Sequence, residues 1–184
     1  MLEGNTKGAI LVVTYERWHT TTYIGVGRHA LIKFGLMTFE YSDSWLLQAI
    51  RLSEHDDKGA TLIDIVKVAD YTNRAIMTYS EFSTGVNKLK SIGLVTERNK
   101  RLLTTDHLKE WWTKKFDGKR KIGVHKGMDE ILKYLNKTYG TVEKQMTKIG
   151  TEITDSDFDK ATREYHKWFS DMENQTTTKK KVKG

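Results

Sequence analysis

The chain has 184 residues, of which 38% are hydrophobic and 30% charged, and its formal net charge is +7. This hydrophobic content is enough for a folded core and excludes wholesale disorder, while the absence of cysteine excludes disulfides, thiolate nucleophiles and cysteine-based metal centres. More than half of the positive excess lies in the last nine residues, so the net charge alone does not indicate a basic folded surface.

The most apolar run near the start of the chain covers only residues 9–13. A secretory signal needs about 7–15 apolar residues and a membrane helix about 20, so neither is indicated. We therefore expect a soluble, cytoplasmic protein with no membrane partner, in which this run forms a buried strand.

Residues 1–41 are predicted to form a strand-like, irregular segment. β-Branched and aromatic residues are frequent at 10–15, 20–26 and 36–41, whereas residues 28–34 fit a helix equally well. Gly25 and Gly27 begin a loose dinucleotide-binding pattern, but no acidic residue follows at the spacing of a ribose-binding carboxylate. A strand turn or bulge explains these glycines more simply.

Three helices are predicted in the first part of residues 42–116. The first begins after Ser42 or Asp43, and the second opens at Thr61 with an acidic residue three positions later. The third opens at Thr78, where Glu81 completes a capping box. Gly93 suits the left-handed position after a helix, so this third helix is expected to cover 78–92.

A β-hairpin and a fourth helix are predicted next. Two short apolar segments within 94–104 flank the turn-forming pair Asn99 and Lys100, and a capped amphipathic helix follows. Three helices, a hairpin and a closing helix form the order of a helix-turn-helix unit with a β-wing.

Residues 117–175 are predicted to be a helical extension and residues 176–184 a disordered basic tail. The last helix begins near Asp155 or Ser156, and its apolar residues recur at spacings of three and four. These residues form an aromatic stripe: Phe158, Ala161, Thr162, Tyr165, Trp168, Phe169 and Met172. The stripe either folds back on its own domain or meets the same stripe of a second copy.

The stretch 78–104 resembles the winged helix-turn-helix superfamily of bacterial regulators, of the MarR and PadR kind. The resemblance rests on the capped third helix, on its exit through Leu89-x-x-Ile92-Gly93-Leu94-Val95, and on Leu103-Thr104 before another helix. The connection from Ala69 to Thr78 is longer than the family's usual turn. The resemblance implies a mainly α fold with a small β-wing over residues 42–116, and a transcriptional regulator that binds double-stranded DNA as a homodimer.

The site residues follow from the expected recognition helix (78–92) and wing (94–104). Hydroxyl and amide side chains can read base edges, and cations and tyrosine can reach phosphates. The predicted base-facing residues are Ser80, Ser83, Thr84 and Asn87. The predicted phosphate contacts are Tyr79, Lys88, Arg98, Lys100 and Arg101.

Two interpretations of this surface stay open. It is either a DNA interface or a solvated charged face on a winged-helix module that binds protein without DNA. A second basic run, from Lys114 to Lys126, fits a hydrated hinge better than a DNA contact. No pattern indicates catalysis, a cofactor or a metal, so we expect none of these.

Overall fold

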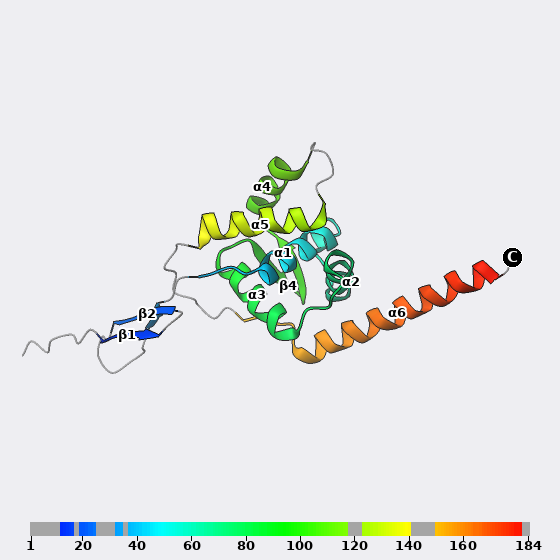
Figure 1. The fold of residues 1–184 in the computed structure, drawn as a ribbon, viewed down its shortest axis with the longest axis horizontal. Helices are drawn as coiled ribbons and strands as arrows, with labels where there is room; N and C mark the ends of the chain where they lie inside the picture. Colours follow the sequence, from blue (N-terminus) through cyan, green and yellow to red (C-terminus); the bar gives the residue numbers. More distant parts are fainter. Residues whose placement is uncertain are drawn as a thin grey trace, which may run out of the picture.

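The computed structural model describes the backbone of residues 12–16, 19–24, 32–34, 37–117, 123–140 and 150–181. Side chains are described from Met37 to Asn174 within these ranges, apart from that of Asp56. These residues form a mainly helical fold with a small two-stranded antiparallel sheet beside the helices, as the sequence predicts, and a second sheet near the N-terminus (Figure 1).

The N-terminal sheet contains β1 (Val12–Glu16), β2 (His19–Ile24) and β3 (Ile32–Phe34), which pair antiparallel in chain order. Strands therefore form in two of the predicted stretches, and β3 shows a strand over residues 32–34, where a helix was the alternative. Within the stretch 36–41, residues 37–40 form no strand and Tyr41 begins α1. The glycine pattern at 25–30 lies outside the described residues.

Helix α1 (Tyr41–Ser53) is the centre of the helical part, since it contacts α2, α3, α5 and β5. It begins two or three residues earlier than predicted. Glu40 and Asp43 form a reciprocal capping box in which the Glu40 backbone N–H donates to Asp43 Oδ2 over 2.8 Å. Leu47, Ala49 and Ile50 are completely buried, so nearly every side of α1 faces protein.

A short 3-10 turn, η1 (Asp56–Lys58), precedes α2 (Leu62–Asn73) and α3 (Tyr79–Ser91). The predicted caps at Thr61 and Thr78 are confirmed, since each hydroxyl accepts the backbone N–H three residues later. The connection before α3 is shorter than predicted because α2 continues to Asn73. Arg74, at φ 52°, ends α2 in the left-handed conformation.

The small sheet pairs β4 (Val95–Arg98) with β5 (Arg101–Thr104). Asn99 and Lys100 both have positive φ, which is the geometry that matches a two-residue hairpin turn to the strand twist. Ala60, between η1 and α2, forms a bridge with Leu102 and extends the sheet by a single pair. Gly93 ends α3 at φ +73°, as predicted.

Helix α4 (Asp106–Phe116) follows the hairpin, and α5 (Val124–Tyr139) packs against α1. The apolar residues predicted to continue the face of α5 lie within 141–149, outside the described residues.

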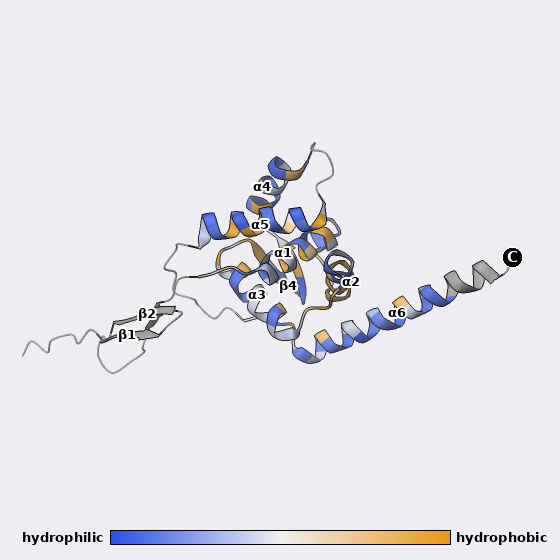
Figure 2. Cartoon of the chain, in the orientation of Figure 1, coloured by the Kyte–Doolittle hydropathy of each residue, from blue (hydrophilic) through white to orange (hydrophobic). Residues whose placement is uncertain are grey.

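Helix α6 (Asp155–Lys181) packs against α2, and its far half extends away from the helical body (Figure 1). Figure 2 shows that α6 is mostly hydrophilic, with a few hydrophobic residues along it. Residues 176–181, which the sequence predicts to belong to a disordered tail, form the last part of α6. The chain has no glycine or proline between Asp155 and Lys181, and lysines in the last turn suit the negative end of the helix dipole. No helix in the described part of the chain combines the length and the apolar composition needed to cross a bilayer.

Candidate nucleic-acid interface

Helix α3 turns one face to the core and the opposite face outward. Phe82, Val86 and Leu89 are completely buried. On the opposite side Ser80 and Thr84 are exposed, and Ser83 is half-buried with its hydroxyl donating to the Ser80 carbonyl over 3.3 Å. The N-terminal half of α3 therefore presents a short row of hydroxyl groups to solvent, with donors and acceptors suited to polar recognition.

Asn87 departs from this row. It lies two turns after Ser80 on the same side of α3, yet it is half-buried, and its Oδ1 is buried without a hydrogen-bond partner in the described part of the chain. Helical spacing accounts for the face on which Asn87 lies, but neighbours distant in sequence decide how deeply it is covered. Its amide oxygen is buried, whereas the sequence predicts an outward-facing amide.

Lys88 is engaged in an ion pair within the chain. Its Nζ lies 2.8 Å from Asp43 Oδ2, and the two side chains are 15% and 3% exposed. Helices α1 and α3 approach closely here, since a Cβ at Gly85 would lie 2.7 Å from Leu46 Cδ2. A carboxylate buried at such a contact needs a cation, so Lys88 serves the fold, contrary to the prediction.

Tyr79 and Lys100 are both held by the chain at the start of α6. Tyr79 donates its hydroxyl to the Ile153 carbonyl over 3.0 Å, and its ring packs beside Phe158. Lys100, at the hairpin turn, pairs with Asp157 Oδ2 at 2.8 Å. Lys100 and the backbone N–H of Thr154 hold the pKa of the Asp157 carboxyl well below its ordinary value. The sequence predicts both Tyr79 and Lys100 as phosphate contacts, and in the structure both side chains have partners within the chain.

Arg98 and Arg101 remain exposed, and they flank the hairpin turn as directly opposed residues on one face of the sheet. With Lys58 they line a hollow of about 290 Å³, whose other lining residues are Asp57, Asn99 and Leu103. Arg101 Nη1 also reaches the Gly59 carbonyl at 3.5 Å. We call Lys58, Arg98 and Arg101 the wing cluster; its three cations face one acid, an arrangement that favours an anionic ligand.

Lys58 is the member of the wing cluster that the sequence analysis missed. It lies in the polar stretch between α1 and α2, which carries no periodic signal. The Ala60–Leu102 bridge and the positive φ of Gly59 bring this stretch against the hairpin. No local sequence pattern indicates Lys58, because its position beside the hairpin depends on pairing between residues 42 positions apart.

The other face of the hairpin is closed by residues 150–157. Glu97, only 2% exposed in its side chain, accepts hydrogen bonds from Lys90 Nζ at 2.6 Å, Thr151 Oγ1 at 2.8 Å and the Glu152 backbone N–H at 3.0 Å. Lys90 Nζ also donates to the Gly150 carbonyl over 2.7 Å, so this segment links α3 to the hairpin.

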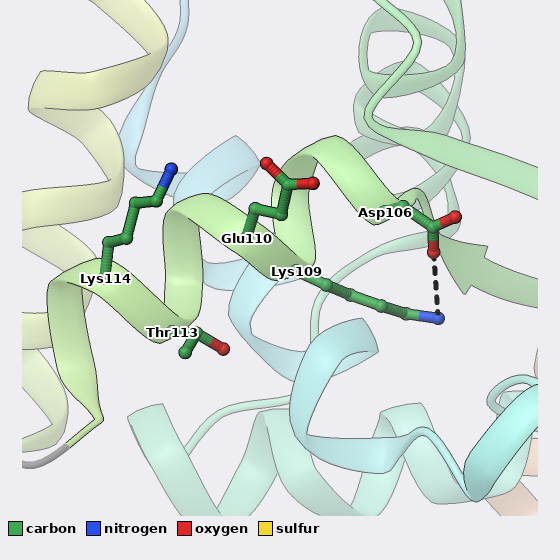
Figure 3. A pocket seen from close by; sticks show the side chains of 5 residues that line it. All are labelled: Asp106, Lys109, Glu110, Thr113 and Lys114. Atoms are coloured by element: carbon green, nitrogen blue, oxygen red, sulfur yellow. Dashed lines mark ion pairs between the residues drawn. The ribbon is translucent and has the colours of Figure 1, made fainter.

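A second hollow, of about 410 Å³, lies along α4 (Figure 3). Its lining side chains all come from that one helix, and Lys109 lies 3.9 Å from Asp106. Glu110 and Lys114 project to one side of the helix in Figure 3, so opposite charges are mixed along the hollow. Of the second basic run, Lys115 pairs with Glu130, which fits a structural role. The described residues contain no group of three potential metal ligands.

Comparisons with protein-family models, with curated proteins and with solved structures found no match to this chain.

Proposed function

We propose that this chain is a winged helix-turn-helix protein that binds double-stranded DNA and acts as a transcriptional regulator. Support comes from the order α1, Ala60 bridge, α2, α3 and hairpin, which corresponds to the three helices and three short strands of that fold. The hydroxyl row of α3 and the wing cluster are the surfaces that this fold uses on a duplex.

In this proposal the two surfaces have different tasks. Ser80, Ser83 and Thr84 meet base edges in the major groove, where hydroxyls both donate and accept. The wing cluster holds phosphates, with the opposed pair Arg98 and Arg101 as its main anchor. Three phosphate contacts would give a slope of about −2.7 for the logarithm of affinity against the logarithm of salt concentration.

The exposed arginine pair carries the proposal, because the other predicted cations of α3 and the hairpin turn have partners within the chain. The test is an anisotropy titration of a random-sequence duplex at about 50 and 200 mM salt. The double variant R98A/R101A should weaken binding and make the salt slope shallower by about 2, since two phosphate contacts are lost.

A matched control changes the net charge equally on another surface. Lys133 and Lys137 are exposed on α5, and K133A/K137A should leave both affinity and salt slope near those of the wild type. If the two double variants behave alike, the binding is only a response to net charge and the wing cluster is not the site.

The second candidate function is a module that uses the same fold to bind protein. The observation that favours it is the engagement of Lys88 and Lys100 in ion pairs, together with the acids at the start of α6. Absence of duplex binding at low salt, or binding that does not weaken as salt rises, would support the module over the DNA-binding protein.

A further inference from the structure

A patch of large apolar side chains lies exposed where α6 leaves α2. Tyr71 on α2 is 82% exposed, and Trp168, Phe169 and Met172 on α6 are 45%, 38% and 42% exposed. These four residues, which we call the α2/α6 patch, line a groove of about 320 Å³ between the two helices. Contiguous exposed apolar surface of this kind marks an interaction site in soluble proteins.

The polar residues around the patch do not close it. Lys67 Nζ lies 4.9 Å from the centre of the Trp168 ring, and Tyr165 donates its hydroxyl to Asp70 beside the groove. These contacts fix α6 against α2 at one end of the groove. Nearly half of the Trp168 side chain still faces solvent, so the groove is formed but not filled.

The far half of α6 is exposed to solvent along its described side chains. Phe158, Ala161 and Tyr165 are buried against the helical body, but every described residue from His166 to Asn174 is exposed. The helix then passes through three successive threonines at 176–178, and β-branched residues are poor helix formers. Since most helical stability in proteins comes from packing of one helix face, a neighbour on the exposed apolar side chains would stabilise this half of α6.

The charges along α6 indicate what kind of partner fits. Its first ten residues contain four acidic and two basic side chains, whereas residues 175–181 contain three lysines and no acid. A parallel neighbour with the same sequence would bring like charges together. An antiparallel copy would place the lysines of one helix beside the acids of the other, and the midpoint of Asp155–Lys181 is Trp168 in the patch.

From these observations we propose that a second copy of this chain covers the α2/α6 patch, through antiparallel two-fold pairing of α6 with Trp168 at the axis. Two-fold dimers are the most common oligomers, and in them one self-complementary patch serves both subunits. This inference does not rest on DNA binding, so either proposal can fail while the other stands.

The first test measures oligomeric state by analytical ultracentrifugation of the full chain over a range of concentrations. We expect a wild-type dimer that weakens as salt rises, because part of the pairing is electrostatic. W168Q/F169Q should raise the dimer dissociation constant at least about tenfold, as loss of central aromatic residues does in other interfaces. L52Q, which removes a 52% exposed apolar residue from α1, is the matched control and should leave the constant unchanged.

The second test measures the direction of the pairing and uses the absence of cysteine in the chain. Phe169 lies next to the proposed axis, so F169C should form a disulfide-linked dimer on mild oxidation. Two copies of T176C would lie about 24 Å apart along an antiparallel pair and should not cross-link, since a disulfide needs Cα atoms within about 7 Å. In a parallel pair the two T176C thiols would face each other and cross-link.

Three results would overturn the proposal: a monomeric wild type at every concentration, a dimer indifferent to W168Q/F169Q, or ready cross-linking of T176C. A monomeric wild type would indicate that another protein covers the α2/α6 patch. Far-UV circular dichroism of each variant checks that the helical body is intact, which we expect because Leu52, Trp168 and Phe169 are exposed in the single chain.

Discussion

Asp43 is a buried charge that contacts both the start of α1 and helix α3. Its carboxylate accepts the Glu40 backbone N–H that helps to cap α1, and it also holds Lys88 of α3 at 2.8 Å. A buried ion pair adds little net stability relative to an apolar pair, but removal of one partner leaves an uncompensated charge. The pair therefore fixes the relation of α3 to α1 more than it strengthens the fold.

We expect Lys88→Met to lower the free energy of unfolding by about 3–5 kcal/mol, because Asp43 would stay buried without its cation. Urea denaturation measures this loss. Lys109→Met is the control: Lys109 lies 3.9 Å from an Asp106 side chain that is 96% exposed, and such surface pairs contribute at most about 1 kcal/mol. Equal effects of the two substitutions would show that Lys88 is not a structural cation.

Tyr165 gives a second residue-scale prediction, at alkaline pH. Burial and the neighbouring Asp70 raise its pKa to about 12, from an ordinary value of 10.0. Because the folded pKa is the higher one, the stability from the neutral hydroxyl is complete below pH 10 and is lost as pH rises towards 12. Tyr165→Phe should cost about 1–2 kcal/mol at neutral pH, through loss of the hydrogen bond to Asp70.

Urea titrations of wild type and Tyr165→Phe at several pH values check this. The difference in unfolding free energy between them should stay constant up to pH 10 and shrink above it. A difference that grows between pH 10 and 12 would contradict the assigned direction of the pKa shift.

Among the elements, the segment just before α6 is joined to the hairpin through Glu97. Glu97 on β4 accepts a hydrogen bond from Lys90 Nζ of α3. It accepts two more from residues 151 and 152, just before α6 begins. A carboxylate can accept from all of these donors at once, whereas an amide turns one of its two positions into a donor. The docking of α6 therefore depends on the charge of Glu97 as well as its shape.

Glu97→Gln should loosen the start of α6 while the helical body stays folded. We expect faster amide hydrogen exchange in the first turns of α6, by about tenfold or more, given the roughly 1.5–3 kcal/mol of a charged hydrogen bond. Exchange in α1 should not change. The control Glu110→Gln alters an exposed residue of α4 and should have no effect on α6.

The elements also show which features the sequence can predict. The caps of α2 and α3 and the end of α3 at Gly93 depend on residues within four positions of one another, so local patterns indicate them. Lys88 and Lys100 find partners 45 and 57 positions away. No spacing rule indicates such partners, and for this reason the helices were predictable while much of the candidate site was not.

At the scale of the whole molecule, the length of α6 determines the distance between the two α3 helices of the proposed dimer. A helix of 27 residues is about 40 Å long, so antiparallel pairing would separate the two α6 N-termini, and the adjoining α3 helices, by about that distance. One turn of DNA measures about 34–36 Å. The two proposals together therefore predict that a dimer contacts two sites on one face of a duplex.

A hydroxyl-radical footprint on a bound operator tests this arrangement. The wild type should protect two stretches about one helical turn apart, and W168Q/F169Q should protect a single stretch or bind more weakly. Unchanged double protection by the monomeric variant would show that the spacing does not come from α6.

The position of the first turn of α6 has a mechanical consequence. That turn touches the hairpin through Asp157 and Lys100, while Ile153 just before it touches α3 through Tyr79. Beyond that turn, α6 packs against α2 through Tyr165 and Trp168 before its far half leaves the helical body. A rigid tilt of α6 would therefore strain its contacts with Lys100, Tyr79 and α2 together, so a partner bound to the far half would act on the hairpin, α3 and α2 at once.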